Sequence, residues 1–193
     1  MIPPMRNVIG NMTQQYDPHK HHRRSIRLPG WDYRSPGYYF VTICTRQRQN
    51  LFDTQAFHEI AANALIHIPQ QAHAQHVVVD EWVVMPNHVH VILQFARHGG
   101  QVDEAATAGS FANAPAGSLG VVVGQYKTAV TTRINHLRGT KGISVWHRGY
   151  YERIIRNERE LMATRQYIVN NPTRWAEDRD NLDTILSKMA YRS

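Results

Sequence analysis

Hydrophobic residues follow two periods along the chain, one typical of strands and the other typical of helices. Short runs rich in β-branched and aromatic residues predict strands over residues 38–45, 76–85, 88–95 and 145–156. The dipeptide Pro86-Asn87 separates the second run from the third and suits a tight hairpin turn. The sequence therefore predicts one hairpin and two further strands.

Two helices are predicted ahead of the last strand. The first begins at Thr54, where apolar residues start to recur at intervals of three and four, and it ends at Pro69. The second begins after Ser118, a favourable N-cap residue, and ends at Gly139.

A third helix is predicted over residues 157–171. Asn157 is a suitable N-cap with Glu160 three residues later, and Pro172 ends the pattern. The apolar stripe of this helix is predicted to comprise Leu161, Met162, Ile168 and Val169. Tyr167 lies close to the opposite side of the helix, so the core does not need it.

The order of elements is strand, helix, strand, strand, helix, strand, helix. Such a chain most readily builds an α+β sandwich of ferredoxin-like type, an antiparallel sheet of about four strands with the helices on one face. We assign this domain to residues 37–175. Residues 1–36 are expected to form a basic, partly ordered arm, residues 98–117 a mobile loop of small side chains, and residues 176–193 a tail without an assigned role.

Length and charge narrow the class of partner. The chain has 193 residues, which suits a single domain. Its 22 Lys and Arg residues exceed its 15 Asp and Glu residues, which gives a formal net charge of +7. A surface of this charge attracts polyanions, and we expect nucleic acid rather than an acidic membrane as the partner.

The single cysteine, Cys44, excludes an internal disulfide and any zinc site built on several thiolates. Histidine, carboxylate or amide groups would have to hold any metal. No apolar run approaches the roughly 20 residues that a membrane helix needs, and the first residues lack the apolar block of a signal peptide. We expect a cytoplasmic protein.

Two histidines stand one residue apart in the run MPNHVHVIL at residues 85–93. On a strand, His88 and His90 project from one face while Val89 and Val91 project from the other, so the two rings are expected on the helix-free side of the sheet. Neutral imidazoles at this spacing can chelate one divalent ion, provided that a third ligand comes from elsewhere in the fold. The alternative is an ordinary pair of strand histidines satisfied by hydrogen bonds.

The end of the third helix offers further polar groups. Asn171 follows Tyr167 by four residues, so a phenol and an amide lie on the same helix face one turn apart. Because Asn171 precedes Pro172, whose ring disfavours helical geometry, Asn170 is the alternative source of the amide.

Five blocks of sequence resemble the REP-associated tyrosine transposases, which are relatives of the single-tyrosine insertion-sequence transposases in the HUH endonuclease superfamily. These blocks are RRSIRLPGWDY (23–33), YYFVTICT (38–45), VVMPNHVHVIL (83–93), VWHRGYYERIIRNERE (145–160) and YIVNNPTRW (167–175). The superfamily name describes two histidines around one bulky apolar residue, here His88-Val89-His90. Followed by a helix with the pattern Tyr-x-x-x-Asn-Pro, this tripeptide becomes specific.

The resemblance implies a role for each matching residue. His88 and His90 would be metal ligands, Asn171 a third ligand, and Tyr167 the nucleophile. The metal would be Mg²⁺ or Mn²⁺, and the substrate single-stranded DNA at or near a hairpin. The reaction would leave a 5′-phosphotyrosine link and a free 3′-hydroxyl. A phenol has an ordinary pKa of about 10 and needs a nearby cation or base to act as a nucleophile.

DNA contacts are expected from basic residues outside this constellation. The candidates are Arg23, Arg24 and Arg27 in the arm, with Lys127 and Arg133 in the second helix. The alternative function is a non-catalytic module that binds nucleic acid on an open sheet, as RNA-recognition folds do. The resemblance favours a monomer, with a dimer as the alternative.

Overall fold

The computed structural model describes residue 28 and residues 30–96 and 116–175. Four antiparallel strands form one sheet in the order β2-β3-β1-β4, which confirms the predicted α+β class. The strands are β1 (Gly37–Cys44), β2 (Val77–Met85), β3 (His88–Phe95) and β4 (Tyr151–Ile155). The α-helices are α1 (Gln55–Ile66), α2 (Leu119–Leu137) and α3 (Glu158–Arg174), and short 3₁₀ turns cover Arg46–Arg48, Leu51–Asp53 and Ile68–Gln70. None of the helices in these ranges is long and apolar enough to cross a membrane.

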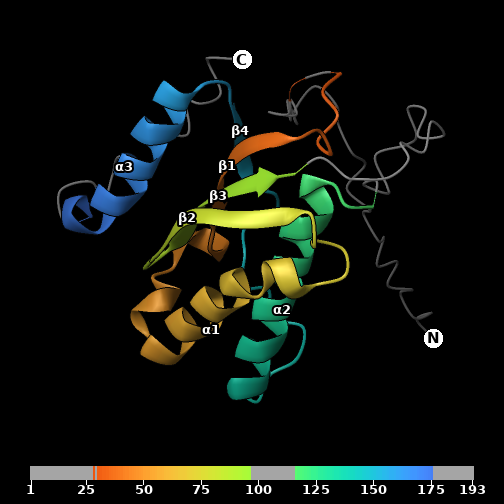
Figure 1. Ribbon diagram of the computed structural model, residues 1–193. Helices are drawn as coiled ribbons and strands as arrows, with labels where there is room; N and C mark the ends of the chain where they lie inside the picture. Colours follow the sequence, from red (N-terminus) through yellow and green to blue (C-terminus); the bar gives the residue numbers. More distant parts are fainter. Residues whose placement is uncertain (1–27, 29, 97–115, 176–193) are drawn as a thin grey trace, which may run out of the picture.

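The main hydrophobic core lies between α1, α2 and one face of the sheet (Figure 1). Tyr39, Val41 and Ile43 alternate along β1 and point into this layer, as do Val89 and Val91 on β3. The predicted alternation of β3 is therefore confirmed, and the two histidines belong to the other face.

Helix α3 packs on that other face, which corrects the prediction that all the helices share one side (Figure 1). A second apolar cluster lies beneath it, formed by Phe40, Ile92, Ile155, Leu161 and Ile168. The central strands are apolar on both faces, and a sheet of that kind has to be covered on both. The face that carries the histidines is therefore not free of helices.

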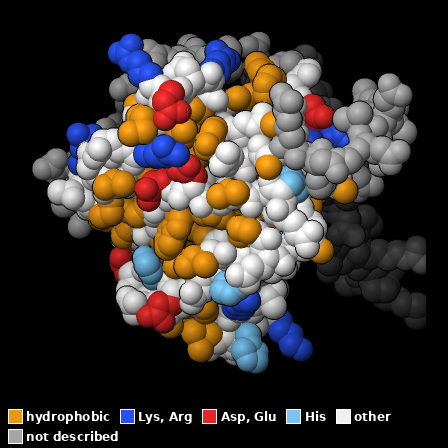
Figure 2. Space-filling view, viewed as in Figure 1, with side chains coloured by type: hydrophobic (Ala, Val, Ile, Leu, Met, Phe, Trp, Pro, Cys, Tyr) orange, Lys and Arg blue, Asp and Glu red, His pale blue; other side chains and the backbone are white. Residues whose placement is uncertain are grey.

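The buried side of α3 also differs from the predicted stripe. Leu161 and Ile168 are buried as expected, but Met162 and Val169 are 55% and 57% exposed. The helix is rotated so that the flank carrying Tyr167 faces the sheet, where an aromatic and polar surface receives it. Figure 2 shows hydrophobic and charged side chains intermingled on the outside of the molecule over α3 and the neighbouring edge of the sheet.

The ends of α3 agree with the sequence at one terminus and differ at the other. The Asn157 side chain accepts a hydrogen bond of 2.9 Å from the backbone N–H of Glu160, which confirms the predicted cap. The helix does not stop at Pro172 but continues to Arg174. Pro172 lies in the last turn, where its missing N–H costs the helix a single hydrogen bond.

Strand β2 contains a bulge that helps to fasten α3. Val79 pairs with Leu93 and Trp82 pairs with Val91, so two residues of β2 stand opposite one residue of β3. Asp80 lies in this bulge, and its carboxylate accepts two hydrogen bonds from the Arg165 guanidinium on α3, one of them 2.8 Å long. A bidentate pair of this kind fixes the helix against the sheet edge.

Strand β4 is shorter than the predicted run of residues 145–156. Trp146 forms only an isolated bridge with Thr45, and regular pairing begins at Tyr151. The Lys127 ammonium donates hydrogen bonds of 2.9 Å and 2.8 Å to the backbone carbonyls of His147 and Gly149, so this segment is fastened to α2 as well as to the end of β1.

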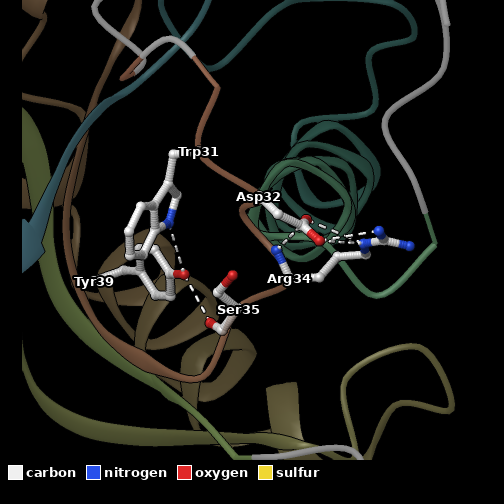
Figure 3. Close-up of polar contacts among 5 residues, drawn as sticks. All are labelled: Trp31, Asp32, Arg34, Ser35 and Tyr39. Atoms are coloured by element: carbon white, nitrogen blue, oxygen red, sulfur yellow. Dashed lines mark hydrogen bonds and ion pairs between the residues drawn. The ribbon is translucent and has the colours of Figure 1, made fainter. Parts of the chain in front are cut away.

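The chain enters β1 through a turn held by side chains (Figure 3). The Tyr39 hydroxyl accepts a hydrogen bond of 3.2 Å from Trp31 Nε1 and donates one of 2.7 Å to the Ser35 carbonyl. Arg34 binds both carboxylate oxygens of Asp32, and this hydrogen bonding lowers the pKa of Asp32. The start of β1, and with it the register of the sheet, is thereby anchored.

The rotation of α3 can be tested with two adjacent residues. Ile168→Ala should lower the free energy of unfolding by about 2–5 kcal/mol because it opens a cavity under the helix. Val169→Ala, one residue along and exposed, should change it by less than about 0.5 kcal/mol. Urea unfolding followed by circular dichroism measures both, and similar losses for the two variants would contradict the observed packing.

Candidate active site

The two histidines project from β3 into the layer beneath α3. His88 lies opposite Cys44 of β1, and His90 lies opposite Thr42. Only 2% of His88 and none of His90 is exposed, although both belong to the face that the sequence suggested would be open. Burial of polar rings to this degree requires that their nitrogens find partners.

The partners of the ring nitrogens form one connected network. The two Nε2 atoms lie 3.1 Å apart. Nδ1 of His88 lies 2.8 Å from Asn87 Oδ1, and Nδ1 of His90 lies 2.8 Å from Thr42 Oγ1. The outer nitrogens are thus held by oxygen atoms, and the inner nitrogens converge on one point.

The position of the His90 proton decides what occupies that point. Because Asn87 Oδ1 accepts a hydrogen bond, His88 carries its proton on Nδ1 and has a free lone pair on Nε2. A proton on Nε2 of His90 bridges the two rings. A proton on Nδ1 is instead donated to Thr42, and two lone pairs then face each other, which is the arrangement that suits a cation.

Both histidines are held in the neutral form. Burial, with a smaller contribution from the nearby positive charge of Arg48, lowers the pKa of His88 to about 3. Burial lowers the pKa of His90 well below its usual value, and the neighbouring His88 adds to the effect. Neutral imidazole is the form that ligates metals.

The geometry of the pair fits a divalent metal. Two nitrogens bound about 2.1 Å from one ion and at right angles to each other would lie about 3.0 Å apart, close to the 3.1 Å found here. Within the described ranges, no group of three or more His, Cys, Asp or Glu residues is arranged to hold a metal. A third protein ligand from these ranges would therefore have to be an amide or a hydroxyl.

Tyr167 reaches the same point from α3. Its hydroxyl lies 3.3 Å from His90 Nε2. Its ring packs edge-on against Phe40 and against His90. A phenol and two imidazole nitrogens therefore meet although 77 residues separate Tyr167 from His90 along the chain.

The two asparagines after Tyr167 have different environments. Asn170 Oδ1 accepts a hydrogen bond of 2.9 Å from Gln166 on the exposed side of α3. Asn170 and Asn171 are both partly buried, but Asn171 follows Tyr167 by one full helical turn and its amide has no side-chain partner among the described residues. Asn171 is therefore better placed than Asn170 to face the histidines, and its role as a ligand stays a prediction.

Of the five residues expected to contact DNA, the structure describes only Lys127 and Arg133, and neither is among the residues in contact with the histidines. Arg23, Arg24 and Arg27 lie outside the described residues. Lys127 is already bonded to two carbonyls, and burial lowers its pKa. Arg133 is exposed on α2, in the layer on the opposite face of the sheet from the histidines. DNA binding by these five residues remains a prediction.

Sequence reasoning missed two neighbours of the histidines. The Trp175 ring, at the end of α3, lies 5.7 Å from the His88 ring. Arg48 belongs to the turn after β1, and its charge acts on His88. Gln47 and Arg48 both adopt left-handed backbone conformations, with φ of 55° and 53°, which costs roughly 1–3 kcal/mol at each non-glycine residue. No sequence signal marks such a conformation at Gln or Arg.

Comparison with known proteins found one curated relative and several solved structures. No family model matches the sequence. An uncharacterized protein of Haemophilus influenzae is 33% identical over 190 residues, which cover 89% of this chain and 100% of the relative.

Two solved structures align with about three quarters of this chain. A REP-associated tyrosine transposase bound to a REP hairpin aligns with a TM-score of 0.49 and 20% identity, over 76% of this chain and 72% of that one. A candidate transposase of Deinococcus radiodurans aligns with a TM-score of 0.39 and 17% identity, over 75% and 95% of the two chains. Likeness at this level carries no conclusion about chemistry.

The buried neutral histidines predict how stability depends on pH. Their folded pKa values lie below the unfolded value of about 6.5, so below that pH the unfolded chain binds protons that the folded chain excludes. The free energy of unfolding of the metal-free protein should therefore fall as the pH drops from about 6.5 toward 3, by up to about 1.4 kcal/mol per pH unit for each histidine.

Urea unfolding in the presence of a chelator measures this slope. The double variant His88→Gln, His90→Gln should show a shallower slope, whereas His136→Gln, which alters an exposed histidine of α2, should keep it. Equal slopes in the double variant and the unchanged protein would contradict the assignment.

Proposed function

We propose that this chain, which belongs to the same protein family as its Haemophilus influenzae relative, cleaves and rejoins single-stranded DNA with Tyr167 as the nucleophile. The observation that carries the proposal is the 3.3 Å separation between the Tyr167 hydroxyl and His90 Nε2, at the point where the two imidazoles converge. The sequence resemblance to REP-associated tyrosine transposases leads to the same chemistry, with a DNA hairpin beside the cleaved site.

The reaction is a transfer of a phosphodiester bond. The Tyr167 oxygen attacks the phosphorus and loses the phenolic proton, while the bond from phosphorus to the 3′-oxygen breaks and that oxygen gains a proton. The products are a 5′-phosphotyrosine and a free 3′-hydroxyl. Because the bond to tyrosine conserves the phosphodiester, the reverse attack by a 3′-hydroxyl rejoins a strand without another energy source.

His88 and His90, with Asn171 as the third ligand, would hold Mg²⁺ or Mn²⁺. Such an ion would supply polarisation of the phosphate and compensation of charge that develops on its oxygens. The chain's own contribution is to keep both imidazoles neutral by burial, to orient them through Asn87 and Thr42, and to hold the phenol beside them.

The alternative of a non-catalytic module with an open, RNA-binding sheet has less support. Such modules stack bases on exposed aromatic side chains of the sheet. Here α3 covers the corresponding face, and Phe40 and Ile92 on the central strands are 3% and 0% exposed. Binding without chemistry would also leave the contact between Tyr167 and His90 without a role.

Covalent trapping tests the nucleophile. With Mg²⁺ or Mn²⁺ and a pool of oligonucleotides that carry a hairpin beside randomised single strands, the protein should form an adduct that survives denaturant. Tyr167→Phe should reduce adduct formation at least about 1,000-fold because no other group replaces the nucleophile. Denaturing gel electrophoresis with labelled DNA measures the adduct.

Tyr126→Phe is the matched control, since Tyr126 is buried on the far side of the sheet against α1. It should retain the adduct and fold normally. An adduct that persists in Tyr167→Phe would place the nucleophile elsewhere, and the absence of any adduct in the unchanged protein would overturn the proposed reaction.

Metal dependence is tested separately by binding. When Mn²⁺ is titrated into the protein, the electron paramagnetic resonance signal of unbound Mn²⁺ should decrease as the ion binds. His88→Gln and His90→Gln should each weaken Mn²⁺ binding by at least about 10-fold, because each variant removes one of the two imidazole ligands. The double variant should weaken it further. Asn171→Ala should weaken it less. Binding that is indifferent to both histidines would exclude them as ligands.

A further inference from the structure

The turn after β1 ends beside the histidine pair. Cys44, the last residue of β1, stands opposite His88 in the sheet. The backbone N–H of Thr45 donates a hydrogen bond of 2.9 Å to the carbonyl of Asn87, the residue before His88. The 3₁₀ turn Arg46–Arg48 follows directly. Two basic side chains are thus fastened to the same end of the sheet as the site.

This turn is held in place by several hydrogen bonds. Thr45 is completely buried, and its hydroxyl lies 2.7 Å from the Gln49 carbonyl and 3.0 Å from the Asn87 carbonyl. The Arg48 N–H donates to the Thr45 carbonyl over 3.2 Å. These contacts enforce the left-handed conformations of Gln47 and Arg48. Strain that surrounding structure maintains in this way is concentrated at functional sites.

The charge of Arg48 acts on the histidine pair from the end of the turn that adjoins it. Arg48 is exposed to solvent, yet its charge is close enough to lower the pKa of His88 beyond the effect of burial. Such a cation disfavours protons on the imidazoles and attracts anions to the same point. A guanidinium matches two phosphate oxygens at once, which an ammonium does not.

We propose that Arg48 binds the scissile phosphate, or the phosphate next to it, and orients it for attack by Tyr167. The inference rests on the proposed function, since it takes the anion beside the histidines to be a DNA phosphate. The strained turn then has a purpose, because it fixes the backbone of a basic residue whose charge acts on His88. Arg46, on the same turn, supplies charge without this contact.

A thermodynamic cycle with neutral phosphates tests the contact. The strand cleaved in the trapping experiment is synthesised with a single methylphosphonate at the scissile linkage or at either neighbouring linkage. Binding is measured by fluorescence anisotropy in the Tyr167→Phe background, where no strand is cut. Arg48→Asn is the variant because asparagine tolerates a left-handed backbone. The matched control is Arg46→Gln.

On the natural strand, Arg48→Asn should weaken binding about 10- to 100-fold, as expected for the loss of a charge-assisted pair. On one of the three methylphosphonate strands the same substitution should change binding less than about 2-fold, because the neutral linkage has already removed the partner. Arg46→Gln should have the same effect on every strand, since it reports general attraction.

In the Tyr167-containing protein, Arg48→Asn should also slow adduct formation about 10- to 100-fold at saturating DNA. If Arg48→Asn weakens binding equally on all the strands, Arg48 does not touch these phosphates and this inference is wrong. The proposed function would still stand in that case, provided that the unchanged protein forms the adduct. If the unchanged protein forms no adduct, the proposed function and this inference fail together.

Discussion

The site depends on the approach of two neutral imidazole nitrogens to 3.1 Å in a buried layer. Such a contact is stable only if a proton or a cation lies between the lone pairs and if water cannot hydrate the rings separately. Asn87 bears on the first condition, because it binds Nδ1 of His88 and so leaves that ring's lone pair on Nε2, facing His90. Helix α3 supplies the second, because its packing closes the layer over the histidines.

Helix α3 therefore has two functions that cannot be separated. It completes the second hydrophobic cluster through Leu161 and Ile168, and it carries the phenol to the histidines. The hairpin contributes the imidazoles and a helix more than sixty residues later contributes the phenol, so the site exists only in the folded chain. The Arg165–Asp80 pair links these two parts directly at the edge of the sheet.

The sequence predicts local features well and the placement of α3 poorly. The hairpin and the Asn157 cap follow from neighbouring residues, and both are observed. Which side of the sheet α3 covers depends on whether the second face of β1 and β3 is apolar. Both strands are continuous apolar runs without alternation, so the sequence does not show which residues belong to which face. Helical periodicity fixes the angle between Tyr167 and Met162 but not which of them meets the sheet. The left-handed turn at Arg48 has no sequence signature.

The bulge in β2 determines which layer each later residue of the strand enters. Asp80 and Glu81 stand opposite a single residue of β3, so β2 has one residue more than its partner at this point. Because of this extra residue, Trp82 is directed toward the α1 and α2 layer and Val83 toward α3. If the strand paired regularly from Val79 onward, Trp82 would stand opposite His90 and the two faces would exchange for the rest of the strand. The bulge is thus what allows the two ends of β2 to serve the same hydrophobic layers.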